Sequence, residues 1–269
     1  MRRWPLPARL AAGWLLLMLF AAVFAPLLAH ADPYAGSADS LLPPLSPGHL
    51  LGTDDVGRDI FAETVFGTRV SLTVGFSTAL IGCIIGVTVG AAAGWRGGLV
   101  DAMLMRMTEF FQTLPRFVLA LIVIALFGPG VLKVIAVIAA LAWPQTARVV
   151  RASVASLRAA PFVDAARVGG MPAGALVLRE ILPNVAAPVV VLAALDVGTA
   201  ILLEAGLGFF GLGDPNLVSW GAMLNEAQQY LRSAWWMAVF PGAAIAATVL
   251  ACNRLGDAIN AAADPRGHA

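Results

Sequence analysis

The stretch PFVDAARVGGMPAGALVLREILP, residues 161–183, decides how the rest of this sequence is interpreted. Pro161 suits the first position of a helix, where its missing N–H costs nothing. Gly169-Gly170 supplies the left-handed stop that ends a helix, and Pro172 can open a second helix. Pro183 is expected to end that second helix before the next apolar run. The stretch therefore predicts two short helices with a break between them.

Long apolar runs flank this stretch, which itself concentrates four charged residues: Asp164, Arg167, Arg179 and Glu180. A short amphipathic helix held between two membrane spans is well suited to docking in a groove of another protein. An ordinary connector between two spans is the alternative.

The composition is that of an integral membrane protein. Of 269 residues, 59% are hydrophobic and only 12% are charged, about half the charged fraction of a soluble domain. Several apolar runs reach the roughly 18–20 residues that a helix needs to cross a bilayer. The runs are continuous rather than alternating, which favours an all-α membrane protein over a barrel. The net charge of +1 gives no support to a nucleic-acid partner, and the two cysteines form no disulfide framework.

We expect six transmembrane helices. The first run could also be a secretory signal, because an A-x-A pattern follows it, but its roughly 19 apolar residues exceed the core of a signal peptide. Pro115 should kink the third helix. The expected spans are 10–28, 70–93, 101–127, 131–149, 186–203 and 237–251. Residues 1–68 would form an N-terminal cytoplasmic tip, the first span and an extracytoplasmic segment, and 69–266 the membrane domain, with a cytoplasmic loop at 152–183.

The distribution of basic residues supports this topology. With both termini inside, four cations lie outside, namely Arg58, Arg69, Lys133 and Arg232. The twelve on the cytoplasmic side are Arg2, Arg3, Arg9, Arg96, Arg106, Arg148, Arg151, Arg158, Arg167, Arg179, Arg254 and Arg266. Twelve against four obeys the positive-inside rule.

Two further patterns concern packing and local structure. Four glycines recur at every fourth residue of the second span, which creates a bare helix stripe for close packing: Gly82, Gly86, Gly90 and Gly94. In the extracytoplasmic segment, Asp54, Asp55, Arg58 and Asp59 cluster without the spacing of a calcium loop. A local ion-paired turn is the expected structure there.

Charged residues inside the expected spans are candidates for a substrate pathway. Arg116 must face an aqueous path, form an ion pair with an acid or extend to the membrane surface. Asp196 would line the pathway or form an ion pair with Arg116. For Glu204, a structural role is at least as plausible. None of them is arranged with a second carboxylate, histidine or nucleophile for catalysis.

The loop at 161–183 resembles a known motif. Asp164-Ala165-Ala166, followed by Gly170 and Ile181-Leu182-Pro183, resembles the EAA loop of permease subunits of bacterial ATP-binding-cassette (ABC) importers. More segments, in the same order, resemble the C-type permease subunit of the dipeptide, oligopeptide and nickel family. These segments are 51–61, 128–130, 181–184, 207–213, 219–224 and 255–266.

The resemblance implies a type I ABC importer permease fold in which the loop docks on a separate ATPase. The expected docking residues are Asp164, Ala165, Ala166, Arg167, Gly170, Arg179, Leu182 and Pro183. Two positions depart from the pattern. Asp164 replaces the family's glutamate and shortens the arm, and Glu180 stands where many relatives carry a basic residue or histidine.

The resemblance also implies the partners: a homologous second permease subunit, two ATPase subunits, an extracytoplasmic solute-binding protein and the lipid bilayer of the bacterial inner membrane. The sequence contains no P-loop, so ATP would be used by the partner subunits, and this chain would bind no cofactor and be no enzyme. An ATP-independent secondary transporter is the alternative, with Arg116 and Asp196 in ion coupling. An intramembrane hydrolase is disfavoured because its metal motif is missing.

Overall fold

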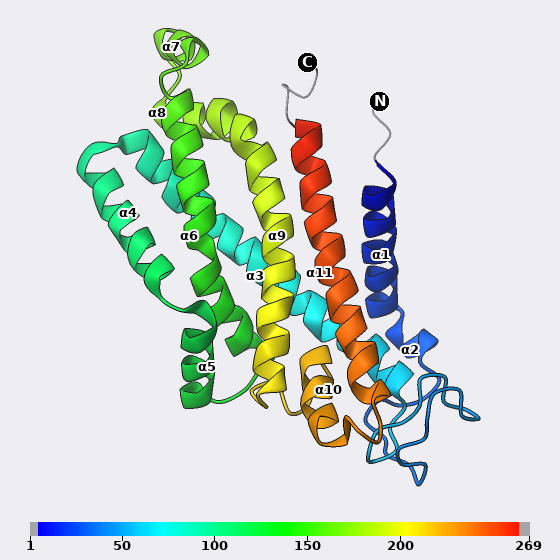
Figure 1. Cartoon of the computed structure of the whole chain (residues 1–269). Coiled ribbons are helices and arrows are strands. Elements are labelled where there is room, and N and C mark those ends of the chain that lie inside the picture. Colours follow the sequence, from blue (N-terminus) through cyan, green and yellow to red (C-terminus); the bar gives the residue numbers. More distant parts are fainter. Residues whose placement is uncertain (1–4, 264–269) are drawn as a thin grey trace.

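Helices form all the elements of residues 5–263, the part of the chain that the computed structural model describes (Figure 1). Arg2, Arg3 and Arg266 lie outside the described residues. The elements are α1 (Leu6–Val23), α2 (Ala25–Leu28), α3 (Ile60–Arg96), α4 (Gly98–Thr113), α5 (Arg116–Phe127), α6 (Val131–Leu157), α7 (Pro161–Val168), α8 (Ala173–Leu176), the π-helical turn η1 (Val177–Ile181), α9 (Leu182–Phe209), α10 (Trp220–Ala227), the 3₁₀ turn η2 (Gln228–Tyr230) and α11 (Trp236–Ala263).

The helices agree with six membrane crossings. Among the described residues, five helical runs are long and apolar enough to cross a bilayer: α1, α3, α6, α11 and the run from Ala173 to Phe209. The sixth crossing is α4 with α5, two helices bent by 81° at a short break. The expected kink is therefore a complete break, because Pro115 lies outside both helices and precedes the first residue of α5.

The arrangement separates two ends of the molecule. The long helices α6, α9, α11 and α1 run side by side, and α3 slants across them (Figure 1). The start of α1, the end of α11 and the projecting α7 lie at one end. The segment 29–59 and α10 lie at the other end. Both ends of the described chain thus lie on the side of α7, as an even number of crossings requires.

The glycine stripe of α3 lies against α6. A Cβ atom added to Gly86 would lie 2.7 Å from the Cβ of Thr146, and one added to Gly90 would lie 2.4 Å from the carbonyl oxygen of Ala147. Cβ atoms added to Gly82 and Gly94 would lie 3.0 Å and 2.6 Å from the nearest atoms of α6. Only glycine permits this separation of the two backbones.

Segment 29–59 is a folded loop at the start of α3. Asp59 caps α3 by accepting a hydrogen bond from the backbone N–H of Ala62 at 2.8 Å. Asp54 Oδ1 accepts from the backbone N–H groups of Val56 and Arg58 at 2.9 and 2.7 Å, and its Oδ2 lies 3.6 Å from Arg58 Nη1. The predicted ion-paired turn is confirmed. Burial raises the pKa of the Asp54 carboxyl.

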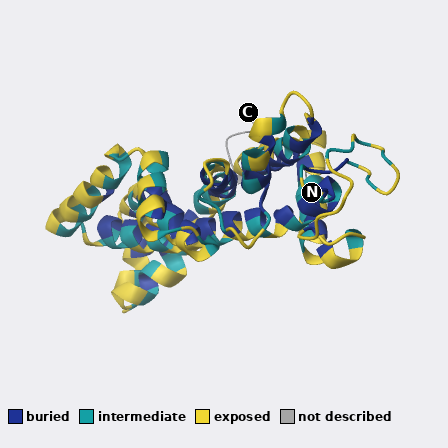
Figure 2. Ribbon diagram, turned by 90° about the horizontal axis from the view of Figure 1, so that it is seen from below, coloured by how far each residue is buried: buried dark blue, intermediate teal, exposed yellow. Residues whose placement is uncertain are grey.

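Exposed apolar side chains cover the outside of the bundle. Viewed along the helices, buried residues follow the contacts between helices and exposed residues face outward (Figure 2). Leu16 of α1 and Leu126 of α5 are 66% and 76% exposed. An extensive exposed apolar surface is typical of a protein embedded in a membrane. The first helix belongs to this bundle, since Trp14 Nε1 donates to Thr248 Oγ1 of α11 at 3.1 Å.

Candidate functional site

Helix α7 projects beyond the ends of the spans and is closed by a glycine cap (Figure 1). Met171 donates its backbone N–H to the carbonyl of Ala166 at 3.1 Å, and Gly170 donates to Arg167 at 3.0 Å. These two bonds form a Schellman motif, in which the residue after the cap adopts the left-handed conformation. Gly170 has φ +80° and meets that requirement. The sequence predicted this stop correctly, and it fixes the direction in which α8 begins.

The inner side of α7 is anchored in a small apolar core. Val163 is fully buried in a cluster that includes Val150 and Val154 of α6, Leu176 of α8 and Ile181 of η1. A short helix alone is unstable in water, so this packing holds α7 in place. Val163 belongs to no motif of the sequence and is one of several apolar residues in an otherwise charged stretch.

The charged residues of α7 contact each other and the end of α3. Arg167 Nη1 donates to Asp164 Oδ1 at 3.1 Å, a pair spaced three residues apart on the helix. The guanidinium of Arg167 also lies 5.2 Å from the centroid of the Trp95 ring, a cation–π contact. Arg167 is thus engaged within the chain, whereas Arg179 is exposed and forms no ion pair within the described part of the protein.

The outer side of α7 leaves apolar groups uncovered. Val168 is 91% exposed and Phe162 is 39% exposed. Asp164 and Ala165, on the same side of the helix, are exposed as well. A rigid helix with an uncovered apolar side is a surface that another protein can cover.

The second helix of the stretch does not end at Pro183, so that prediction was wrong. The run from Ala173 to Phe209 is continuous through the π-helical turn η1. Proline has no N–H and crowds the carbonyl four residues earlier, and a π turn widens the helix to accommodate it. Leu182 accordingly donates its N–H to the carbonyl of Val177, and Asn184 Nδ2 donates to the carbonyl of Glu180 at 2.6 Å. Leu182 packs on the apolar cluster beside α7, and Pro183 is exposed.

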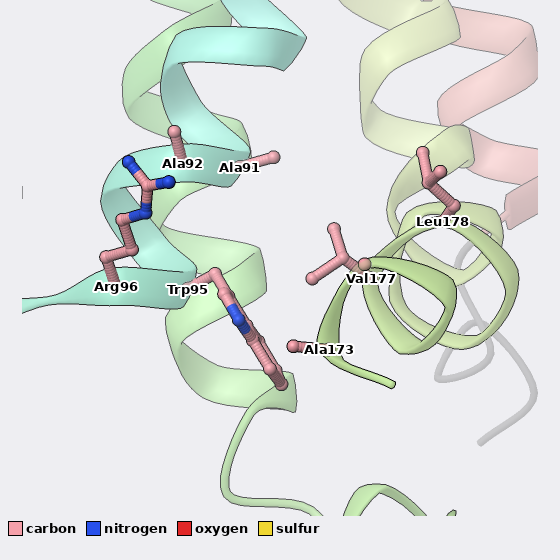
Figure 3. A pocket seen from close by; sticks show the side chains of 8 residues that line it. Ala91, Ala92, Trp95, Arg96, Ala173, Val177 and Leu178 are labelled. Carbon is pink, nitrogen blue, oxygen red and sulfur yellow. The ribbon is translucent and has the colours of Figure 1, made fainter. Parts of the chain in front are cut away.

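An open groove lies next to this loop. It has a volume of about 430 Å³ and separates the end of α3 from α8 and η1 (Figure 3). Trp95 and Arg96 line one wall, and Ala173, Val177 and Leu178 line the other. The ring of Trp95 therefore contacts α7 while also forming part of the groove.

Arg116 and Asp196 line one small cavity inside the bundle. Arg116 is the first residue of α5, directly after the 81° break, and Asp196 is 8% exposed in α9. Thr78 of α3 also lines this cavity, and its Oγ1 is buried without a hydrogen-bond partner among the described residues. Within the described chain, Arg116 and Asp196 do not approach to the 4.0 Å of an ion pair, so the ion pair, one of the two alternatives for Asp196, does not form. They instead line the same small cavity, whose other lining residues are mostly apolar.

Glu204 has a structural contact. Its Oε2 accepts a hydrogen bond from Ser71 Oγ at 3.0 Å, and both side chains are buried. This bond joins α9 to α3. The sequence left the role of Glu204 open, because a hydrogen-bond partner 133 positions away cannot be predicted from a local pattern.

Comparisons with known proteins agree with this architecture. The family model described as "binding-protein-dependent transport system inner membrane component" matches residues 86–267. The dipeptide transport system permease protein DppC of Alkalihalophilus pseudofirmus is 40% identical over 91% of this chain and 81% of its own length. The di/tripeptide transport system permease protein DppC of Pseudomonas aeruginosa is 38% identical over 94% and 86%.

A solved structure shares the fold. A chain from the inward-facing MetNI methionine ABC transporter superposes with a TM-score of 0.54 at 20% identity, covering 73% of this chain and 96% of that one. Together, the family match, the two permease relatives and the helical fold give one answer. The chain belongs to the binding-protein-dependent transport system inner membrane component family, as a multi-pass permease of the ABC importer type.

Proposed function

We propose that this chain forms half of a translocation pathway for di- or oligopeptides and is driven by a separate ATPase that docks on residues 161–183. One observation carries this proposal. Helix α7 combines an anchored inner side at Val163 with an uncovered outer side at Phe162 and Val168. A helix fixed in this way transmits a displacement, whereas a mobile loop would absorb it.

The path for that displacement runs through continuous structure. Helix α7 packs on α6 through the cluster around Val163, and α8 leads without a break into the long helix that ends at Phe209. In the mechanism we propose, ATP binding closes a pair of ATPase subunits, moves α7 and shifts α6 and α9. The permeation pathway then changes the side to which it is open, an alternating-access cycle. Arg116 and Asp196 are the proposed polar lining of the pathway.

The proposed partners follow from the family. A homologous second permease subunit would complete the pathway, two ATPase subunits would bind the α7 loops, and an extracytoplasmic binding protein would deliver the solute. ATP would be bound and hydrolysed by the ATPases, and this chain would need no cofactor of its own. The peptide class of solute is proposed from the relatives, which are named as dipeptide and di/tripeptide permeases. The alternative of an ATP-independent secondary transporter gains no support from the family.

The proposed location is the bacterial inner membrane, with α7 and both chain termini in the cytoplasm. The arginine distribution supports this orientation. The shared end of α7, the start of α1 and the end of α11 agrees with it (Figure 1).

Transport in reconstituted vesicles tests the proposal. Proteoliposomes that contain the chain, its sister subunit and the ATPases should accumulate a labelled dipeptide only when ATP and the binding protein are supplied. Accumulation by vesicles that lack the ATPases would contradict it.

A further inference from the structure

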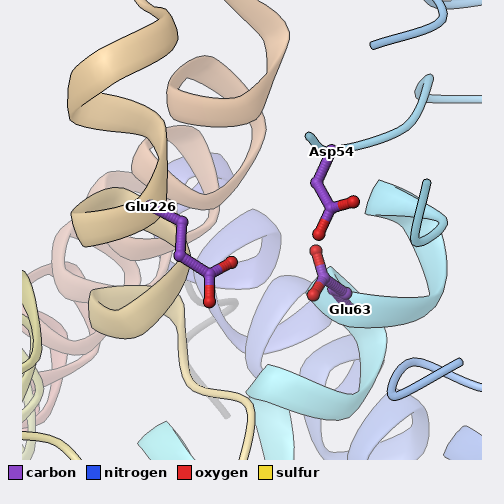
Figure 4. Close-up of side chains that lie close together, drawn as sticks. All are labelled: Asp54, Glu63 and Glu226. Carbon is purple, nitrogen blue, oxygen red and sulfur yellow. The ribbon is translucent and has the colours of Figure 1, made fainter. Parts of the chain in front are cut away.

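Three carboxylates from separate parts of the chain meet in one cluster (Figure 4), at the end of the molecule opposite α7 (Figure 1). They are Asp54 of segment 29–59, Glu63 in the first turn of α3, and Glu226 of α10. One oxygen of each lies within 4.8 Å of the others. The side chains of Asp54 and Glu63 are only 0% and 2% exposed. Buried carboxylates need a counter-charge or a donor for each oxygen.

Arg58 is close to all three carboxylates but satisfies them poorly. Its Nη1 lies 3.6 Å from Asp54, 3.6 Å from Glu63 and 3.5 Å from Glu226. Charge-assisted hydrogen bonds between such groups are usually about 2.7–2.9 Å long. The Nε of Arg58 is itself buried without a hydrogen-bond partner in the described chain. The guanidinium therefore lies near the cluster without completing it.

Asp54 provides a second observation that points to a ligand. Its Oδ1 is held by two backbone N–H groups, so the carboxylate has a fixed orientation. Its Oδ2 is fully buried and has no hydrogen-bond partner among residues 5–263. The carboxylate points toward that of Glu63 (Figure 4). An oriented, buried oxygen without a donor is suited to bind a cation.

Charge and size identify the kind of cation. A carboxyl group binds a metal in its ionised form. With all three ionised, the cluster and Arg58 together carry a net charge of −2, which a divalent cation neutralises and an ammonium group does not. Ca²⁺ takes several protein oxygens at about 2.3–2.6 Å in a flexible geometry, whereas Mg²⁺ gives up its water reluctantly and binds through only one or two carboxylates. Three carboxylate oxygens within 4.8 Å of one another can surround one ion of the first kind. We infer that Asp54, Glu63 and Glu226 form a binding site for a divalent cation of the size of Ca²⁺.

The surroundings leave room for this ion. A cavity of about 140 Å³ adjoins Arg58, Glu63 and Glu226 and is also lined by Tyr34 and Asp214. Water there can complete the coordination shell, and the side chain of Arg58, which is 29% exposed, can turn aside. A bound ion would tie segment 29–59, α3 and α10 together.

Calorimetric titration of the purified full-length chain, first stripped with a chelator, tests the inference with Ca²⁺ and Mg²⁺ as probes. We expect one Ca²⁺ per chain and binding of Mg²⁺ weaker by on the order of tenfold. Glu226→Gln should weaken the binding of Ca²⁺ by on the order of tenfold, because the charge of the ligands sets the affinity for the ion. Asp39→Asn is the matched control, because it removes an exposed carboxylate of the same segment. Arg58→Gln should strengthen Ca²⁺ binding by removing a competing positive charge.

The wild-type chain failing to bind Ca²⁺ saturably would overturn the inference, and so would an equal loss in Glu226→Gln and Asp39→Asn. If Arg58→Gln does not fold, thermal unfolding supplies the second measurement. Ca²⁺ should raise the unfolding temperature of the wild type, and that of Glu226→Gln by less at the same Ca²⁺ concentration. Neither readout involves transport, so the inference stands or falls separately from the proposed function.

Discussion

The guanidinium of Arg167 lies over the ring of Trp95, 5.2 Å from its centroid, and so connects α7 to the last turn of α3. The same guanidinium donates to Asp164. The contact with Trp95 holds α7 against the end of α3, while Val163 holds it against the apolar cluster that includes residues of α6. If α7 carries motion between an ATPase and the spans, these contacts determine how much of that motion is transmitted.

Trp95→Leu should reduce coupling more than stability. The cation–π contact at such an exposed site contributes about 0.5–1 kcal/mol, so the chain should still fold. The ratio of peptide transported to ATP hydrolysed, measured in proteoliposomes, should fall. Trp235→Leu, which removes a half-exposed tryptophan directly before α11, is the control and should leave the ratio unchanged. Equal ratios in both variants would show that the Trp95 contact plays no part in coupling.

Gly170→Ala should destabilise the loop through its backbone. A Cβ at Gly170 meets no atom within 4 Å, so the cost comes from φ +80°, about 1–2 kcal/mol for a left-handed non-glycine residue. Gly174 is also free of contacts but lies inside α8, where alanine favours the helix. Proteolysis of the loop in detergent should therefore be faster for Gly170→Ala and no faster for Gly174→Ala. The opposite order would contradict the glycine cap.

Gly90→Ala should destabilise the whole bundle. The added methyl group would lie 2.4 Å from the carbonyl oxygen of Ala147, and overpacking of this kind costs about 1–3 kcal/mol. Gly13→Ala in α1 meets no neighbour and should be neutral or slightly stabilising. Thermal unfolding in detergent measures both. Unchanged stability of Gly90→Ala would mean that α3 and α6 are farther apart than described.

Asp196→Asn should slow peptide uptake without changing its dependence on ATP. The substitution removes a charge from the interior cavity shared with Arg116 and keeps the volume of the side chain. The measurements are the initial uptake rates with ATP and with a pH gradient alone. They distinguish a permease driven by ATP from a secondary transporter driven by an ion gradient. Uptake driven by the gradient in the wild type and abolished in Asp196→Asn would support the secondary transporter instead.

The sequence predicted the elements that depend on local chemistry. The length of the apolar runs predicted the spans. The spacing of the glycines predicted the stripe that packs against α6, and Gly170 predicted the end of α7. Pro183 was misjudged because proline usually breaks a helix, and a sequence does not reveal that a π turn will accommodate it. The break at Pro115 was expected as a kink, but its 81° angle depends on the packing of α5.

Contacts between distant residues could not be predicted. Trp95 lies 72 positions before Arg167, and Glu226 lies 163 positions after Glu63, so no local pattern links either pair. Arg116 and Asp196 were both singled out because a charge is costly inside a membrane, and they line the same cavity. That they form no ion pair could not be known without the distances that the fold supplies. The acidic residues of segment 29–59 lack the spacing of a calcium loop. The carboxylates that meet in the fold are a different set, because Glu63 and Glu226 lie outside that segment and only Asp54 lies within it.

The central claim is that α7 is the docking site of the motor, and Asp164→Arg tests it most directly. Glu109→Arg is the matched control, because Asp164 and Glu109 are both exposed acids that form an ion pair with an arginine three residues away. The measurement is the amount of ATPase that co-purifies with each variant from detergent. We predict a loss of about tenfold for Asp164→Arg, equivalent to about 1.4 kcal/mol, and wild-type recovery for Glu109→Arg. Wild-type recovery of the ATPase with Asp164→Arg would contradict docking at α7.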